Sequence, residues 1–247
     1  MTTIELQPIH DEPALLCKEK LLLIIADLHI GIETELQQNG LQVPSQTGLM
    51  QERVIALIET YEITDLVILG DVKHNIPTAS TQERSDVRRF LDALHDRVAL
   101  HIIPGNHDGN LGRLLSPDIT LYSSDGAVLD GIGLVHGHRW PSEEVMRCDQ
   151  VAVAHTHPTI MLTDRLGYRT FEPCWLRASC DQKKLQEKYP AARDPIVFVL
   201  PAFNPLCGGI AVNTDPMLGP FHTLLDIPNA LVYLLDGSAL GKVRDIK

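Results

Sequence analysis

The apolar positions of the chain form short continuous runs that end in polar residues. The run "LLLIIADLH" (21–29) is apolar up to Asp27, a pattern typical of a strand buried on both faces. The runs "DLVILGD" (65–71) and "VALHIIPGNHD" (98–108) have the same form. These three segments predict neighbouring buried strands, and the apolar residues before position 21 predict an N-terminal hairpin.

Amphipathic segments lie between these runs. Apolar residues recur at helical spacing at Met50, Val54, Leu57, Ile58 and Tyr61, and again at Val87, Phe90, Leu91 and Leu94. The sequence "STQE" (80–83) before the second set resembles a capping box. The stretch "QQNGLQVPSQTG" (37–48) has the composition of a loop. Alternating strands and helices predict a layered α/β fold.

The pattern changes from about Ile119. Short apolar segments are separated by Asp125-Gly126 and Asp130-Gly131, which are hairpin signals. Further strand candidates are "LVHGH" (134–138), "VAVAHTH" (151–157), "IVFVLPAFN" (196–204) and "ALVYLL" (230–235). We therefore expect a second, more antiparallel sheet that the strands of 161–247 complete. The polar stretch 180–195 predicts an exposed helix or loop insertion.

Composition fits an ordinary globular protein. Of the 247 residues, 44% are hydrophobic and 21% charged, so we expect one domain over 1–247 with a motif-bearing core at about 20–160. No apolar run approaches the roughly 20 residues that span a bilayer, and the N-terminal segment contains acids instead of a basic leader. A cytoplasmic protein without membrane association is the expectation. The five scattered cysteines predict neither a disulfide framework nor a thiolate zinc site.

The charge balance bears on the partners of the protein. A formal net charge of -11 argues against a broad basic surface for duplex DNA. It leaves a nucleic-acid substrate open, because acidic residues around bound cations contribute to this charge while the occupied site attracts phosphate.

Clusters of metal-capable side chains follow the predicted strands: "ADLH", "GDVKH", "GNHD", "VHGH" and "AHTH". The carboxyl ends of neighbouring strands are where an α/β sheet builds its site. Residues i and i+2 of a strand point to the same side, so Asp27 with His29, and His155 with His157, can face one ion or two adjacent ions. Asp71 has two carboxylate oxygens and could bridge two ions. With the Asn106 amide and the His136 imidazole, this mixed set suits Mn, Fe, Zn or Co.

The order D-x-H, GD, GNHD, H, H-x-H between Ile24 and Pro158 resembles the binuclear metallophosphoesterase (calcineurin-like) superfamily. The segments "ADLHIGIE", "NGLQVP", "LGDVKH", "PCWLR", "LPAFNPLCGG" and "VYLLDGSALG" resemble, more closely, the small archaeal SbcD-related phosphoesterases and the bacterial DNA-ligase-associated phosphoesterases. The resemblance implies a four-layer α/β/β/α sandwich, in which two mixed β-sheets are flanked by helices.

The resemblance also implies roles for individual residues. One divalent ion is held by Asp27, His29 and His157, the other by Asn106, His136 and His155, and Asp71 bridges them. His107 is the catalytic histidine, and Asp108 orients it. Mn²⁺ is the expected metal, with Fe, Co, Ni or Zn as alternatives. Ala154 stands where the family usually has glycine, but that position is not a ligand.

Several other polar residues lie beside these motifs. His74, His138 and Arg139 are candidates for substrate contact or for support of the ligands, with an ordinary loop position as the alternative. Lys73 and Trp140 are further candidates for contacting a nucleic acid, and the alternative for both is an ordinary surface residue.

The implied function is hydrolysis of phosphoesters by a phosphodiesterase or nuclease acting on DNA or RNA, single-stranded or short. Two ions would lower the pKa of a water between them, and His107 would supply a proton to the leaving oxygen. The alternatives are a phosphomonoesterase or nucleotide phosphodiesterase with the same metal centre, and a noncatalytic binding scaffold. Association with DNA repair or processing proteins and formation of homo-oligomers stay open.

Overall fold

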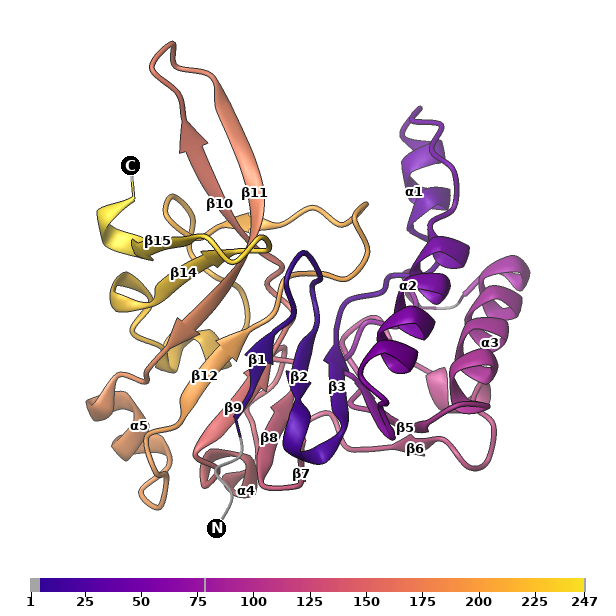
Figure 1. Cartoon of the computed structure of the whole chain (residues 1–247), viewed down its shortest axis with the longest axis horizontal. Coiled ribbons are helices and arrows are strands. Elements are labelled where there is room, and N and C mark those ends of the chain that lie inside the picture. The colour runs from indigo at the N-terminus through magenta and orange to yellow at the C-terminus, as the bar shows by residue number, and fades with distance from the viewer. Residues whose placement is uncertain (1–4, 78, 247) are drawn as a thin grey trace.

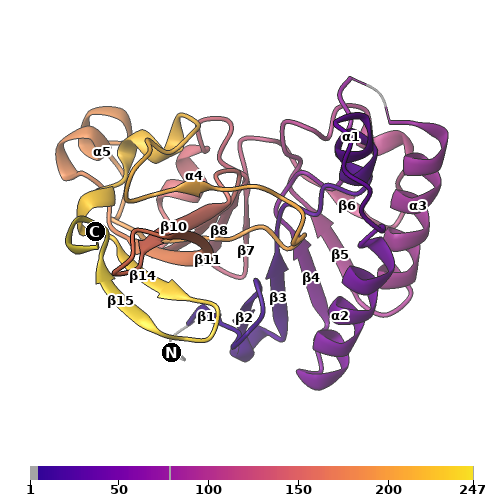
Figure 2. The same ribbon diagram turned by 90° about the horizontal axis from the view of Figure 1, so that it is seen from above.

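Two β-sheets pack face to face in the computed structural model, which describes residues 5–77 and 79–246. Helices cover the outer face of each sheet, as Figures 1 and 2 show. The strands of the first sheet, in order across it, are β1 (Gln7–Pro8), β2 (Leu15–Cys17), β3 (Leu22–Ile25), β4 (Asp65–Ile68), β5 (Ala99–Ile102) and β6 (Thr120–Leu121). β3 to β6 run parallel, and the predicted N-terminal hairpin joins β1 to β2.

The second sheet is also mixed. Its main order is β13 (Ile210–Ala211), β10 (Pro158–Thr163), β11 (Arg169–Ala178), β12 (Ile196–Val199), β9 (Gln150–Val153), β8 (Ile132–Val135) and β7 (Ala127–Leu129). β14 (Leu231–Leu234) pairs with β11 and with β15 (Ala239–Lys242). The C-terminal strands therefore belong to this sheet.

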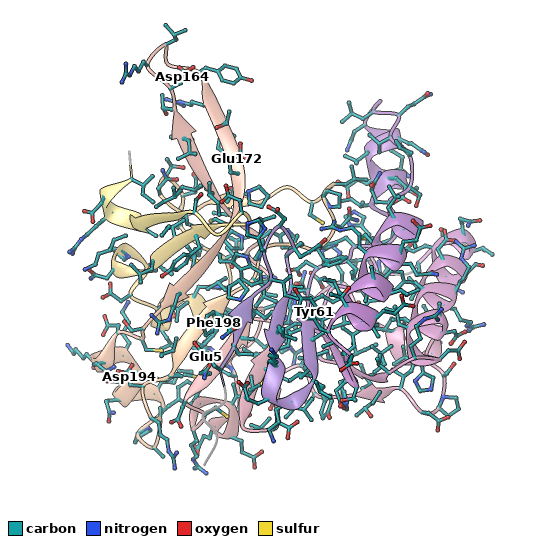
Figure 3. All side chains as sticks on the ribbon, in the orientation of Figure 1. Glu5, Tyr61, Asp164, Glu172, Asp194 and Phe198 are labelled. Atoms are coloured by element: carbon teal, nitrogen blue, oxygen red, sulfur yellow. The ribbon has the colours of Figure 1, made fainter. Side chains whose placement is uncertain are left out.

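The hairpin of β10 and β11 projects beyond the body of the molecule (Figure 1). In Figure 3, Asp164 lies near its tip and Glu172 on its second strand. Leu166, next to the tip, is 94% exposed.

The helices are α1 (Ile32–Gln38), α2 (Thr47–Thr60), α3 (Thr81–His95), α4 (Glu143–Met146) and α5 (Gln182–Lys188). Short 3-10 helices cover Lys18–Lys20, Leu111–Arg113, Phe221–Leu224, Ile227–Asn229 and Val243–Asp245. The capping box at Ser80 and Glu83 is present, and α5 lies within the predicted polar insertion.

Three hydrophobic clusters separate four layers. Along β3, Leu23 and Ile25 pack toward α2 and α3, whereas Leu22 and Ile24 pack toward the second sheet. A third cluster fills the space between the second sheet and the helices α4 and α5. Because alternate residues of a strand face opposite sides, a strand between two cores is apolar throughout. The predicted four-layer α/β/β/α sandwich is confirmed.

The two Asp-Gly pairs behave differently. Asp130-Gly131 forms the two-residue turn between β7 and β8, and both residues have positive φ, as predicted. The hairpin predicted at Asp125-Gly126 is wrong, because β6 before it lies in the first sheet and β7 after it in the second. This glycine serves a crossing between sheets, where a Cβ at Gly126 would lie 2.5 Å from the carbonyl oxygen of Leu134.

Candidate metal centre

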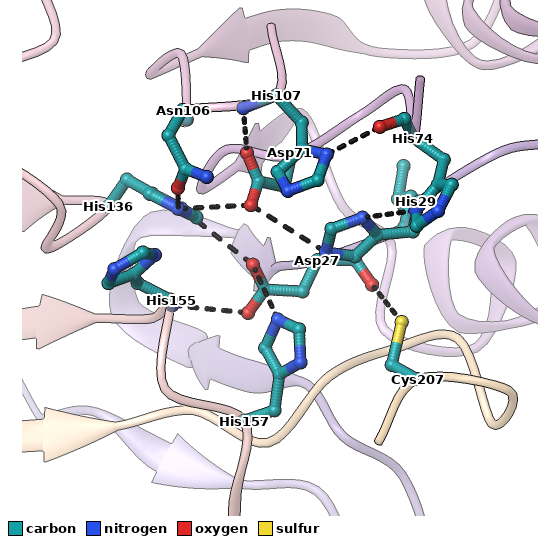
Figure 4. A network of polar contacts seen from close by, with 12 residues as sticks. Asp27, His29, Asp71, His74, Asn106, His107, His136, His155, His157 and Cys207 are labelled. Atoms are coloured by element: carbon teal, nitrogen blue, oxygen red, sulfur yellow. Dashed lines mark hydrogen bonds and ion pairs between the residues drawn. The ribbon is translucent and has the colours of Figure 1, made fainter. Parts of the chain in front are cut away.

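The predicted ligands come from the loops that follow five strands. Asp27 and His29 follow β3, Asp71 follows β4, and Asn106 follows β5. His136 follows β8 in the second sheet, and His155 and His157 follow β9. The structure thus brings all seven side chains to one site where the two sheets meet (Figure 4).

The backbone at this site is left-handed at most of the ligand positions. The residues with positive φ are Asp27 (56°), His29 (40°), Asp71 (50°), His155 (75°) and His157 (46°). Asp and His adopt this conformation more readily than most residues, and such outliers cluster at functional sites. Asp27 with His29, and His155 with His157, therefore reach the site from left-handed loop backbone, and not from the extended strand that the sequence predicted for residues i and i+2.

Asp27, His29, Asp71 and His157 form the first group of potential ligands. The His157 Nε2 atom lies 3.4 Å from Asp27 Oδ1, and His29 Nε2 lies 3.6 Å from Asp71 Oδ2. Asp27 is fully buried, and His29 is 4% exposed.

Asp71, Asn106, His136 and His155 form the second group. His136 Nε2 lies 3.3 Å from Asp71 Oδ2 and 3.3 Å from Asn106 Oδ1. The His155 ring lies 5.0 Å from the His136 ring, and one ligand atom each of His155, His136 and Asp71 fall within 4.8 Å of one another. Asp71 therefore belongs to both groups and stands where a bridging carboxylate is needed.

Buried polar atoms without a hydrogen-bond partner test whether this site fits metal ions. Within the described residues, Asp27 Oδ1, His29 Nε2 and His157 Nε2 are buried and have no hydrogen-bond partner. Such orphaned polar atoms are costly unless something binds them. They point into the first group, and their carboxylate and imidazole chemistry fits a divalent transition metal.

The opposite ring nitrogens are held by backbone carbonyls. His136 Nδ1 donates to the carbonyl oxygen of Leu69 at 2.9 Å, and His157 Nδ1 donates to that of Gly208 at 2.9 Å. Each bond leaves Nε2 as the atom that faces the site, which is the usual way in which outer contacts orient metal-binding histidines.

Charge and burial set the protonation of the site. Burial raises the pKa of Asp71, but hydrogen bonding and charge from His136 together hold it well below its usual range. Burial alone would lower the pKa of His136, but the hydrogen bond and charge of Asp71 raise it to about 9. Burial lowers the pKa of His29 to about 3 and that of His155 to about 4, so both rings are neutral and available as ligands.

Comparison with known proteins gives the family. The calcineurin-like phosphoesterase family matches the sequence over residues 21–173, more than half of the chain. The chain belongs to that family. As a calcineurin-like phosphoesterase it is a hydrolase of phosphoester bonds whose family depends on two metal ions.

Two solved structures resemble this phosphoesterase. The Pseudomonas putida nuclease MPE aligns with a TM-score of 0.58 and 22% identity over 94% of this chain and 98% of that one. Yfce, a phosphoesterase from E. coli, aligns with a TM-score of 0.39 and 19% identity over 90% and 97%. The first likeness shows the same fold. No curated protein matches the sequence of this phosphoesterase.

His107 lies beside both ligand groups. Its backbone N–H donates to Asp71 Oδ1 at 2.8 Å, and its ring Nδ1 donates to the carbonyl oxygen of His74. The ring stands edge-on to that of His29, with centroids 4.7 Å apart. The Nε2 atom of His107 is thus the one left for a substrate.

Asp108 differs from the prediction that it orients this ring. Its Oδ1 accepts from the backbone amide of Val72 at 2.9 Å, and its Oδ2 accepts from that of Gly105 at 2.9 Å. The His74 carbonyl oxygen, and not the Asp108 carboxylate, accepts from Nδ1 of the His107 ring. Burial raises the pKa of Asp108 to about 6. Asp108 joins the loops after β4 and β5 and positions His107 through the backbone.

His74 contacts the predicted ligand His29 and does not line the cavity of the site. Its Nδ1 lies 3.1 Å from Nδ1 of His29, and its Nε2 lies 2.6 Å from a carboxylate oxygen of Glu35 in α1. Of the two roles predicted for His74, this geometry matches support of a ligand. Glu35 was missed from the sequence, because no motif connects it with the loop after β4.

Cys207 was also missed. One ligand atom each of Cys207, His29 and His157 lie within 4.8 Å of one another, and its Sγ lies 3.9 Å from the carbonyl oxygen of Asp27. The "LCGG" sequence that carries it signalled only a turn.

The remaining candidates are placed as follows. The ring of His138 lies 5.2 Å from that of His136, so it stands beside the second ligand group. Arg139 follows it and is exposed. The ring of Trp140 faces the ammonium of Lys188 at 3.8 Å. Both readings of Lys73, as a nucleic-acid contact and as an ordinary surface residue, are wrong. This side chain is buried, and its Nζ donates to the carbonyl oxygens of Asn75 and His107.

No helix among the described residues is both long enough and apolar enough to cross a membrane.

Proposed function

We propose that this protein is a Mn²⁺-dependent phosphodiesterase that acts as a nuclease on single-stranded or short DNA or RNA. The observation that carries the proposal is the pair of ligand groups joined at Asp71, with His107 beside them. Asp27 and His136 lie buried behind a cavity of about 390 Å³, which is lined by the other five predicted ligands, His107, Gly208, Gly209 and Leu218.

Each residue has a part in this reaction. Two divalent ions, when bound, supply Lewis acidity toward phosphoryl oxygens and lower the pKa of water. Asp27, His29 and His157 would hold one ion, Asn106, His136 and His155 the other, and Asp71 would contact both. The His74 carbonyl fixes a proton on Nδ1 of His107. With Nδ1 held by this carbonyl, His107 presents Nε2 to the substrate, and a proton on Nε2 can pass to the leaving oxygen and leave the ring neutral with its Nδ1–H in place.

Two observations support a nucleic-acid substrate. The cavity opens at the surface between loops, with Asn106 exposed, so a chain can pass across it. The Pseudomonas putida protein that has the same fold is a nuclease. The acidic net charge of -11 favours a single strand or short oligonucleotide over tightly bound duplex.

The test is an activity matrix of metals against substrates on the purified protein. The metals are Mn²⁺, Co²⁺, Ni²⁺ and Zn²⁺, and the substrates are bis-p-nitrophenyl phosphate, p-nitrophenyl phosphate and labelled single-stranded DNA and RNA. We expect the diesters to be cleaved fastest with Mn²⁺. His107→Ala should keep its bound metal and lose turnover by about 10²–10⁴-fold, the range of general acid catalysis.

Other outcomes would replace the proposal. Preference for p-nitrophenyl phosphate would make the protein a phosphomonoesterase, and no hydrolysis with any metal would make it a scaffold. Loss of metal and activity together in His107→Ala would mean that His107 is a ligand.

A further inference from the structure

Four arginines line one groove on the outer side of the first sheet. Arg84, Arg88 and Arg89 come from α3, and Arg113 comes from the 3-10 helix Leu111–Arg113. All four are exposed, and the groove has a volume of about 630 Å³. The chain as a whole has a net charge of -11, so this groove has the opposite charge to the molecule that carries it.

The arginines are poorly neutralised. Arg89 pairs with Asp86 at 2.7 Å, and Arg84 Nε donates to the carbonyl oxygen of Ala79. For Arg88 and Arg113 the described part of the chain provides no ion pair. One acidic side chain, Asp92, lines the groove, and its Oδ1 accepts from the hydroxyl of Ser116. The groove therefore keeps a positive charge that favours an anion.

The groove adjoins the loop that carries His107. Arg84, Arg113 and Leu114 also line a smaller cavity of about 110 Å³, whose other walls include Gly109 and Asn110. These two residues come after His107 and Asp108 in the same loop, and His107 lines the cavity of the metal centre. The arginines and the metal centre thus flank the same short loop.

α3 is fixed to the metal centre by Glu83. The buried Glu83 carboxylate accepts hydrogen bonds from the backbone amides of His74 and Asn75, at 2.9 and 2.8 Å. Its other oxygen accepts from the N-cap amide of Ser80. Because His74 contacts His29 and His107, the helix that carries three of the arginines has a fixed position relative to the site.

We propose that the groove formed by Arg84, Arg88, Arg89 and Arg113 binds the phosphate backbone of a nucleic-acid strand whose scissile phosphate lies at the metal centre. This inference rests on the proposed nuclease function and adds to it a second contact region. Arginine forks match phosphate oxygens in geometry, and contacts of this type give affinity without base specificity. The groove makes a longer strand a better substrate than a short ester.

The experiment compares two double variants of equal charge. Arg88→Gln with Arg113→Gln alters the groove. Arg97→Gln with Arg147→Gln removes the same charge from exposed positions outside it. Affinity for a fluorescent single-stranded oligonucleotide is measured by anisotropy against salt concentration, in a His107→Ala background to limit cleavage. Hydrolysis is measured without that substitution, both of the oligonucleotide and of bis-p-nitrophenyl phosphate, whose single phosphate cannot occupy the metal centre and the groove together.

The expected effect follows from counterion release. Four phosphate contacts on a single strand give a log–log salt slope of about -2.8, so affinity falls about 50-fold between 50 and 200 mM salt. Two contacts give a slope of about -1.4 and a fall of about 7-fold. The groove variant should show the shallower slope and a raised KM for the oligonucleotide, with unchanged hydrolysis of the small diester. The control variant should behave as the unaltered protein.

Three results would overturn the proposal. An unchanged slope in the groove variant removes the groove from substrate binding. An equal change in the control variant makes the effect one of overall charge. The third result is a groove variant that binds polyglutamate more weakly but binds the oligonucleotide as the unaltered protein does. That result would assign the groove to an acidic protein segment. Failure of the proposed nuclease function gives a different result from failure of the groove proposal. In that case the unaltered protein cleaves the small diester but neither binds nor cleaves nucleic acid.

Discussion

Metal uptake by this protein should release a proton from His136. Burial alone would lower the pKa of His136, but the hydrogen bond and charge of Asp71, with the charge of Asp27, raise it to about 9. At pH 7 the ring is then about 99% protonated, and a metal ligand must be neutral. Deprotonation at this pH costs about 3 kcal/mol, which weakens the apparent metal affinity by about two orders of magnitude. The affinity should rise about tenfold per pH unit from pH 7 toward pH 9.

Calorimetric titration of Mn²⁺ in buffers of different ionisation enthalpy counts the released protons. His155 gives a matched control, because burial lowers its pKa to about 4 and it has no proton to lose at pH 7. His136→Gln should release about one proton fewer than the unaltered protein, and His155→Gln should release the same number. Equal proton release by the two variants would refute the assignment of this proton to His136.

Two further predictions concern stability and geometry. Burial lowers the pKa of His222 to about 3, so the unfolded chain, with a pKa near 6.5, binds the proton first as pH falls. Protonation of the unfolded chain at His222 should therefore lower the free energy of unfolding by about 2 kcal/mol between pH 8 and pH 5. Urea denaturation should show a smaller decrease in His222→Leu than in the unaltered protein. An equal decrease in both would contradict the lowered pKa of His222. Gly70 has φ 82°, and a Cβ there would lie 2.2 Å from His136 Nδ1, whereas Gly40 has φ 85° and open space around it. Gly70→Ala should lower bound metal per chain and Gly40→Ala should not; equal metal content in both would show that the His136 position tolerates the clash.

Periodicity predicted the main elements because burial decides them. The residues of the two predicted helix faces, such as Met50 and Phe90, are buried in α2 and α3, except Tyr61, which is half-buried just after α2. α1 was missed because Ile32 is its one buried residue, so it has no apolar stripe to recognise. The β6 to β7 crossing was read as a hairpin, because a local Asp-Gly signal carries no information about which sheet the next strand joins.

For the candidate site, the sequence indicated which residues lie together but not all of their contacts. The polar ends of strands identify residues that the fold brings together, because strand ends meet at a sheet edge, and the family's order of motifs assigns their roles. The contacts of Asp108 and Glu35 were not predictable. They depend on which backbone amides and rings face each carboxylate across loops distant in sequence, and no local spacing encodes that. Coordination by the seven predicted ligands stays a prediction.

The left-handed ligand loops indicate how the site keeps its shape. Each non-glycine residue in this conformation costs about 1 kcal/mol or more, against a net stability of about 5–15 kcal/mol for a domain. The two strained loops bind one another through their backbones. Asp27 N–H donates to the Gly70 carbonyl oxygen at 3.1 Å, and His29 N–H donates to that of Asp71 at 2.8 Å.

The second sheet is tied to the same loops. His155 N–H donates to Asp27 Oδ2 at 3.3 Å, and Asn204 Nδ2 donates to the carbonyl oxygen of Leu28 at 2.8 Å. The strain is therefore offset by hydrogen bonds between protein groups. These bonds hold the predicted ligands in place, so binding energy from the ions is left to overcome the protonation of His136 and the charge repulsion between Asp27 and Asp71.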